Sequence, residues 1–247
     1  MRTPFIAGNW KMHTTEGEAV ELAGAVAART AGAPCEVAVC VPFPHLGPVR
    51  AALADSHVRL GAQDVHWEPK GAFTGEVSVP MLEDYCALVI IGHSERRQYF
   101  GETDEWVNRK LRAVLASRLD PIVCVGETLD QRRSGETQAV LERQVRGALA
   151  GLDPSPRLTI AYEPVWAIGT GETATPDQAQ EACAFIRGLL RELGGSVADA
   201  IRIQYGGSVN PANARDLLTL PDVDGALVGG ASLNAEQFAA ICAAAPA

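Results

Sequence analysis

The chain has 247 residues, of which 47% are hydrophobic and 21% are charged, and its formal net charge at pH 7 is −9. This composition predicts a globular protein with a full hydrophobic core, and no apolar run reaches the length of about 18 residues that a membrane span needs. The acidic balance argues against nucleic acid as the main partner, although one locally positive pocket could still bind a small anion.

The N-terminal stretch Met1-Arg2-Thr3-Pro4 lacks the apolar core of a secretion signal, so we expect a cytoplasmic protein. The cysteines form no C-x-x-C pair, and most of them lie in apolar stretches. We therefore expect reduced, buried thiols rather than disulfides or zinc ligands. The six positions are Cys35, Cys40, Cys86, Cys124, Cys183 and Cys242.

Strand-like and helix-like segments alternate along the whole chain. The expected strands are short apolar runs at Phe5–Asn9, Val37–Val41, Val58–Ala62, Ala87–Ile91, Ile122–Val125, Leu158–Tyr162, Arg202–Tyr205 and Ala226–Val228. The expected helices follow them at Thr15–Ala28, Leu46–Ala54, Val79–Glu83, Ser94–Tyr99, Asp104–Ser117, Leu129–Leu149, Pro176–Leu193, Asn210–Leu218 and Asn234–Ala244.

Eight strand–helix units in one chain of this length predict an α/β fold, a (β/α)₈ barrel, with a doubly wound open sheet as the alternative. The strands are apolar without alternation, as expected for a parallel sheet covered on its faces. No linker or composition break interrupts the chain, so residues 1–247 are expected to form a single domain. In a barrel the active site lies at the carboxyl ends of the strands.

Two kinds of chemistry stand at these strand ends. Asn9-Trp10-Lys11, His93 and Glu163 supply a cation, an imidazole and a carboxylate. Gly206-Gly207-Ser208 and Gly229-Gly230 supply glycine-rich turns ahead of expected helices, where backbone amides and the helix dipole favour a phosphate. Each feature alone also has an ordinary interpretation, as a turn, a solvated lysine or a structural histidine.

The loop after the sixth strand runs from Glu163 to Thr175 and is longer than the usual two to six residues. Its stiff start, Pro164-Val165-Trp166, and its small middle, Ile168-Gly169-Thr170-Gly171, suit a lid over an anionic substrate. An ordinary surface loop is the alternative. Thr175-Pro176 predicts the N-cap and first residue of the next helix.

Several site types lack their signatures. The sequence has no spaced histidine or cysteine pattern for a metal, no G-x-G-x-x-G after a strand for a dinucleotide, and no serine-centred nucleophile elbow. We therefore expect no metal and no cofactor. Glu95, Arg96 and Arg97 are expected to form a structural ion-pair set. After these exclusions, the remaining interpretation of the strand-end residues is cofactor-free acid–base chemistry on a small phosphorylated compound.

Five motifs resemble the triosephosphate isomerase family, occur in that family's order and span nearly the whole chain. They are Ala7–Met12, Gly92–Arg97, Ala161–Gly171, Tyr205–Val209 and Gly225–Gly230. The resemblance implies an intramolecular aldose–ketose isomerase, which interconverts dihydroxyacetone phosphate and D-glyceraldehyde 3-phosphate in glycolysis and gluconeogenesis.

The resemblance also implies roles for individual residues. Glu163 is the base that moves a proton between two substrate carbons, and His93 is a neutral electrophile that hydrogen-bonds the enediolate oxygens. Lys11 is a fixed positive charge, and Asn9 is a companion donor. Glu95 is similar to the family's second carboxylate near Lys11, with its part in catalysis or orientation left open. A helix beginning after His93 would disfavour the imidazolium form.

By the same resemblance the substrate phosphate binds Lys11 and the backbone amides of Gly169, Ser208, Gly229 and Gly230. Phosphate contacts would close a lid that spans Pro164, Val165, Trp166, Ala167, Ile168, Gly169, Thr170 and Gly171. Closure would press Ile168 and Leu227 against Glu163 and raise its basicity by desolvation.

The family is dimeric, and residues 71–76 resemble its interface loop, so Thr74 is expected to lie beside a second copy's Lys11. Two departures from the family pattern, His13 and Glu172, are expected to have modest effects. Two other functions stay open: another phosphate-binding barrel enzyme, which need not combine Lys11, His93 and Glu163, and a non-catalytic barrel used as a scaffold.

Overall fold

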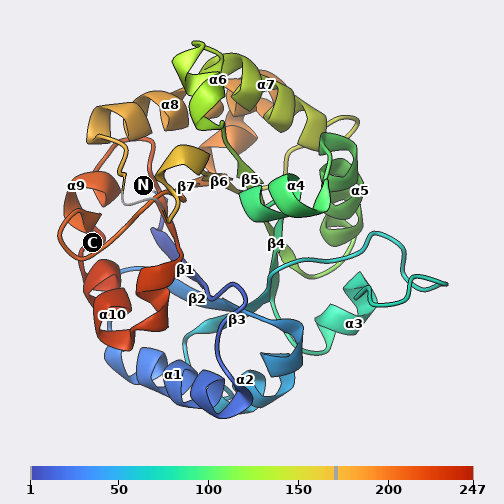
Figure 1. The fold of residues 1–247 in the computed structure, drawn as a ribbon, viewed down its shortest axis with the longest axis vertical. Coiled ribbons are helices and arrows are strands. Elements are labelled where there is room, and N and C mark those ends of the chain that lie inside the picture. The colour runs from blue at the N-terminus through green and yellow to red at the C-terminus, as the bar shows by residue number, and fades with distance from the viewer. Residues whose placement is uncertain (1, 170–171, 247) are drawn as a thin grey trace.

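The computed structural model describes residues 2–169 and 172–246 and has eight parallel strands closed into a barrel (Figure 1). Each strand pairs with the next in the chain, and β1 pairs with β8 to close the ring. The strands are β1 Phe5–Asn9, β2 Glu36–Val41, β3 Arg59–Ala62, β4 Leu88–Ile91, β5 Asp120–Val125, β6 Thr159–Tyr162, β7 Arg202–Tyr205 and β8 Gly225–Val228. The predicted (β/α)₈ barrel is confirmed, and the open sheet is excluded.

Helices surround this ring, as Figure 1 shows. The α-helices are α1 Glu16–Arg29, α2 Leu46–Ala52, α3 Val79–Glu83, α4 Ser94–Phe100, α5 Asp104–Leu115, α6 Leu129–Arg133, α7 Thr137–Ala148, α8 Pro176–Gly194, α9 Ala214–Leu218 and α10 Ala235–Ala243. The short 3-10 helices in the described part of the chain are η1 Phe43–His45, η2 Val165–Ala167, η3 Gly195–Asp199 and η4 Gly230–Leu233.

Alternate residues of each strand face opposite sides of the barrel wall. Phe5 and Ala7 pack in the barrel interior, whereas Ile6 between them packs in the layer between strands and helices. Both layers are apolar, which explains why the strands read as continuous hydrophobic runs. Burial of one such large side chain stabilises the fold by about 1.5–3 kcal/mol.

Two helix predictions were wrong in detail. The expected helix Leu129–Leu149 is two helices, α6 and α7, because Gly135 between them has a φ of 74°, which ends the first helix. The helix expected from Asn210 begins only at Ala214. The Asn210 carboxamide instead accepts the amides of Ala212 and Asn213 and forms a turn.

Cap chemistry places the start of α8 where the sequence predicts it. Thr175 is the N-cap, and its hydroxyl accepts the backbone amide of Gln178 at 3.3 Å. The Gln178 side chain in turn accepts the Thr175 amide at 3.0 Å, and Pro176 occupies the first helical position. These reciprocal bonds end the loop after β6 at a defined point.

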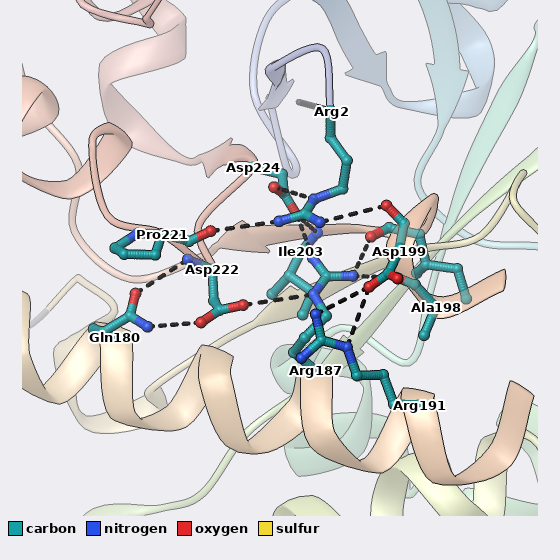
Figure 2. Close-up of polar contacts among 11 residues, drawn as sticks. Arg2, Gln180, Arg187, Arg191, Ala198, Asp199, Ile203, Pro221, Asp222 and Asp224 are labelled. Carbon is teal, nitrogen blue, oxygen red and sulfur yellow. Dashed lines mark hydrogen bonds and ion pairs between the residues drawn. The ribbon is translucent and has the colours of Figure 1, made fainter. Parts of the chain in front are cut away.

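The amino ends of β1, β7 and β8 meet in a buried charged network (Figure 2). Asp224 directly precedes β8. Its carboxylate accepts hydrogen bonds from the Nη2 of Arg187 and from the Nε of Arg2, both at 2.5 Å. It also accepts the backbone amide of Ile203 at 2.8 Å. Arg187 projects from α8 and is only 1% exposed, so its charge depends on this carboxylate for compensation.

Candidate functional site

All the predicted catalytic and substrate-binding residues except Glu95 meet in one cavity at the carboxyl ends of the strands. The cavity has a volume of about 430 Å³, within the range of small-molecule sites. Its lining includes the predicted residues Asn9, Lys11, His93, Glu163, Ile168, Gly169, Ser208, Leu227, Gly229 and Gly230. The predicted residue Glu95 lies outside this lining and reaches the cavity through Lys11.

Glu163 follows β6 directly, and its carboxylate is buried with 2% exposure. One oxygen, Oε1, lies 2.9 Å from the Nε2 of His93, and the other, Oε2, accepts the backbone amide of Ser94 at 2.8 Å. Burial raises the pKa of Glu163, but the charge and hydrogen bond of His93, together with Ser94, outweigh it and hold that pKa below its ordinary value. Glu163 is thus a carboxylate in this arrangement.

His93 is the N-cap of α4, and its ring orientation is determined by the backbone. The amide of Glu95 donates to the Nδ1 of His93 at 3.2 Å, so Nδ1 accepts and the proton of the neutral ring lies on Nε2, facing Glu163. Burial lowers the pKa of His93, but the Glu163 carboxylate outweighs it and the net pKa lies above the ordinary value. The expected helix start after His93 is confirmed, whereas the expected lowering of its pKa is opposed by Glu163.

Lys11 lies just after β1 in an uncommon backbone conformation, with a φ of 53°. Its backbone is held by two side chains: its amide donates to the Oδ1 of Asn9 at 3.0 Å, and its carbonyl accepts the Nε2 of Gln63 at 2.9 Å. Its ammonium lies 2.5 Å from the Oε1 of Glu95. A strained backbone retained beside a cavity is typical of a functional residue.

The expected ion-pair set after His93 is divided among different partners. Arg96 pairs with Asp64 and Glu102, at 2.9 and 2.8 Å. Arg97 pairs with Asp104 at 2.6 Å. Glu95 is not part of this structural set, because its carboxylate pairs with Lys11 across the strand ends.

The glycine-rich turns after β7 and β8 line the same cavity as Lys11. Gly229 is followed at once by the 3-10 helix η4, which was not predicted, whereas the helix expected from Asn234 is α10, with Asn234 as its N-cap. The turn after β7 differs, because α9 begins six residues beyond Ser208. The amide and hydroxyl of Ser208 both donate to the carbonyl of Ala167, at 3.0 and 2.9 Å.

The first half of the predicted lid packs against the carboxyl end of β5. Trp166 donates its indole N–H to the Oε1 of Glu127 at 3.0 Å, and the amide of Val165 donates to the Glu127 carbonyl at 3.0 Å. Glu127 is fully buried and also accepts the hydroxyl of Tyr162 at 3.1 Å. The predicted lid residues Thr170 and Gly171 lie outside the described residues.

Sequence reasoning missed two contributors to the site. Ser94 acts through its backbone amide, which no residue-type pattern could reveal. Glu127 could have been found, because it follows β5 by two residues and so lies at the same carboxyl end of the barrel as the other site residues. Beside it, Gly126 has no room for a Cβ, which would lie 1.7 Å from the carbonyl oxygen of Glu163.

A larger cavity of about 670 Å³ shares Glu163 and Ile168 with the first one and is bounded by α4, the β5–α6 loop and Trp166. Its lining does not include Lys11, Asn9 or the glycine turns after β7 and β8. Arg97 is the cation of this larger cavity, whereas the smaller cavity combines Lys11 with the two glycine turns.

A third cavity, of about 320 Å³, adjoins the site on its outer side and includes Lys11, Glu95 and the apolar residues Met12, Phe43 and Phe100. Met12 is 95% exposed and Phe100 65% exposed, which is unusual for large apolar side chains. The predicted interface loop 71–76 is likewise exposed at Phe73 and Thr74.

Within residues 2–169 and 172–246, no group of three or more His, Cys, Asp or Glu side chains is placed to hold a metal ion. In the same ranges, no helix combines the length and the apolar character that crossing a membrane requires.

The family model described as triosephosphate isomerase matches residues 4–245. Relatives named triosephosphate isomerase from Carboxydothermus hydrogenoformans and Moorella thermoacetica are each 58% identical, over 249 and 244 residues, with 98% of both chains covered. A crystal structure of triosephosphate isomerase from Bartonella henselae matches with a TM-score of 0.91 and 40% identity, covering 98% of each chain.

Proposed function

The chain belongs to the triosephosphate isomerase family, and from this premise we propose how its residues interconvert dihydroxyacetone phosphate and D-glyceraldehyde 3-phosphate. The reaction serves glycolysis and gluconeogenesis. The observation that carries the proposal is the convergence of Lys11, His93 and Glu163 on one cavity with two glycine turns. A coupled assay on D-glyceraldehyde 3-phosphate tests it, and a folded protein without turnover would refute it.

Glu163 is the base of the proposed mechanism. Its carboxylate takes a proton from the hydroxyl-bearing carbon next to the carbonyl, which leaves an enediolate, and then gives a proton to the former carbonyl carbon. The hydroxyl proton passes from one substrate oxygen to the other in the same conversion. His93 donates from Nε2 to the enediolate oxygens, and its Nδ1, which accepts the Glu95 amide, keeps that donor proton on Nε2. A neutral histidine in this role is this family's established example of pKa tuning.

Glu163 must leave its present partners before it can act. Ser94 and His93 hold its two oxygens, and both partners stabilise the carboxylate at the expense of its basicity. Substrate in the cavity competes for His93, so substrate binding and the release of Glu163 are coupled. Without the charge of Glu163 beside it, burial of His93 favours the neutral ring that the reaction needs.

The phosphate handle is assigned to Lys11 and to the amides of Gly169, Ser208, Gly229 and Gly230. The Ser208 amide, which donates to Ala167 here, must exchange that carbonyl for a phosphate oxygen. This exchange would remove one of the hydrogen bonds that hold the first turn of the lid, where the Ser208 hydroxyl also donates to Ala167. Val165 and Trp166 attach the same turn to Glu127. Phosphate binding and lid movement are thereby linked through one serine.

Phosphoglycolate, an analogue of the enediolate, should stabilise the protein strongly against heat, and no stabilisation at millimolar ligand would count against the site.

The pKa of His93 should fall in the variant Glu163→Gln, because the carboxylate that raises it is gone while burial remains. In the wild type, the His93–Glu163 ion pair stabilises the fold between the lowered pKa of Glu163 and the raised pKa of His93. That stabilisation is lost as the pH falls through the lowered pKa of Glu163, and it is also lost as the pH rises through the raised pKa of His93. An NMR titration of the His93 ring measures the change. Glu181→Gln, on the exposed face of α8, is the control; an equal pKa in all three proteins would contradict the pairing.

We also propose that the active protein is a homodimer, a single domain of residues 1–247 in each copy, located in the cytoplasm. The exposed apolar cavity of Met12, Phe43 and Phe100 beside Lys11 supports the dimer, since a second copy's loop 71–76 would cover it. The glycolytic substrates support the location.

Thr74→Arg should convert the dimer to monomers, because a long charged side chain would enter an apolar cavity that admits a threonine. Sedimentation velocity measures the mass in solution. Thr219→Arg places the same charge on the exposed end of α9 and should leave the mass unchanged. An unchanged profile for Thr74→Arg would remove the loop from the interface.

A further inference from the structure

Two cysteines that are 207 positions apart in the chain meet at the amino ends of the strands. Cys35 directly precedes β2, and Cys242 lies near the end of α10. The Sγ of Cys35 lies 3.6 Å from the carbonyl oxygen of Cys242. Closure of the barrel explains the proximity: β1 pairs with both β2 and β8, and α10 packs against α1 (Figure 1).

The two thiols differ in exposure and acidity. Cys35 is half-buried, whereas Cys242 is fully buried. The proximity of Cys242 lowers the pKa of Cys35, whereas the proximity of Cys35 and burial raise the pKa of Cys242, so Cys35 is the thiol that forms a thiolate more readily. A thiolate with solvent access is the nucleophile in thiol–disulfide exchange.

We propose that Cys35 and Cys242 are a redox site, in which Cys35 reacts with low-molecular-weight disulfides and Cys242 resolves the adduct into an intramolecular disulfide. In the first step the Cys35 thiolate attacks one sulfur of the small disulfide and releases one small thiol. In the second step the Cys242 sulfur attacks Cys35 and releases the other. Two electrons and two protons pass from the protein to the small disulfide, which becomes two thiols.

The remaining cysteines do not compete for this chemistry. Each is buried, and burial raises the pKa of its thiol. They are Cys40, Cys86, Cys124 and Cys183. Exchange should therefore be selective for Cys35.

The disulfide should stabilise the fold without changing catalysis. It would join the start of β2 to the last helix and close a loop that contains most of the chain. A long closed loop lowers the conformational entropy of the unfolded state more than a short one does. The active-site cavity lies at the opposite, carboxyl ends of the strands. We expect a rise in Tm of about 5–15 °C, with unchanged kcat and KM.

The test treats the folded protein with glutathione disulfide, quenches with acid and counts thiols after denaturation. We expect the count to fall from six to four. Cleavage by trypsin and a glutamate-specific protease separates Cys35 from Cys40, and the expected cross-link joins peptides 30–36 and 237–247. Dithiothreitol should reverse both the cross-link and the gain in Tm.

Three variants separate the steps. Cys35→Ser should abolish thiol loss, Cys242→Ser should leave a stable glutathione adduct on Cys35 without a gain in Tm, and the control Cys86→Ala should still form the cross-link. Six remaining thiols in the treated wild type, or a Cys35 adduct without the cross-linked peptides, would overturn the proposal. The wild-type measurement decides it even if a variant folds poorly.

Discussion

Glu163→Gln is expected to lower kcat by about 10²–10⁴-fold, the usual contribution of a positioned general base. This loss corresponds to about 3–5 kcal/mol of transition-state stabilisation. Glutamine has nearly the same shape and can still accept the Ser94 amide through its carbonyl oxygen, so the local fold should persist. It cannot take a proton from carbon, and the chemical step should therefore fail while the phosphate site stays intact.

The measurement for Glu163→Gln pairs the coupled assay with a thermal shift by glycerol 3-phosphate. This ligand carries the phosphate group of the substrate but cannot form an enediolate. Its binding depends on the phosphate contacts, which do not involve Glu163, and should therefore be retained. Glu181→Gln, an exposed carboxylate on α8, should behave as wild type in both experiments. Activity of Glu163→Gln near the wild-type level would remove Glu163 from the role of base, and loss of ligand binding would show that the variant damages the cavity.

Asp224→Ala is expected to lower the free energy of unfolding by about 3–5 kcal/mol, because it leaves the buried guanidinium of Arg187 without its main partner. The variant also removes the acceptor for Arg2 and for the Ile203 amide, which are part of the same network (Figure 2). The loss corresponds to a fall in Tm of about 6–20 °C in a protein of this size.

Chemical denaturation measures the stability change, and kinetics of the folded variant should be unaltered because this network lies at the amino ends of the strands. Asp199→Ala is the matched control. It breaks a pair with Arg191 in which both side chains are 59% exposed, so it should cost less than about 1 kcal/mol. Adding Arg187→Met to Asp224→Ala should recover part of the loss, because no unpaired buried charge remains. A small effect of Asp224→Ala alone would mean that water or another carboxylate compensates Arg187.

The local pattern of apolar and polar residues predicted the order of strands and helices, because secondary structure depends mainly on residues that are close together in the chain. Short apolar runs indicated all eight strands, and Thr175-Pro176 indicated where α8 begins. The errors arose where a local choice was ambiguous. Helical periodicity continued across Gly135, although its left-handed conformation ends α6, and Asn210 could cap a helix or close a turn.

The sequence by itself also determined which residues gather at the candidate site. In a barrel, the residue that follows a strand must stand at its carboxyl end, so strand ends alone bring Lys11, His93 and Glu163 to one side. Only the tertiary structure decided how they pair. Glu163 contacts His93 and the Ser94 amide. The contact of Lys11 with Glu95 was implied by the family resemblance and is confirmed.

The same division holds at the opposite end of the barrel. Nothing in the sequence near Asp224 shows that Arg2 will reach it, and nothing near Cys35 shows that it will meet Cys242. These contacts exist because β1 closes the ring against β8, which brings the beginning and the end of the chain together. Periodicity and caps depend on neighbours along the chain, whereas a pairing across the ring depends on closure, so the tertiary structure alone could reveal it.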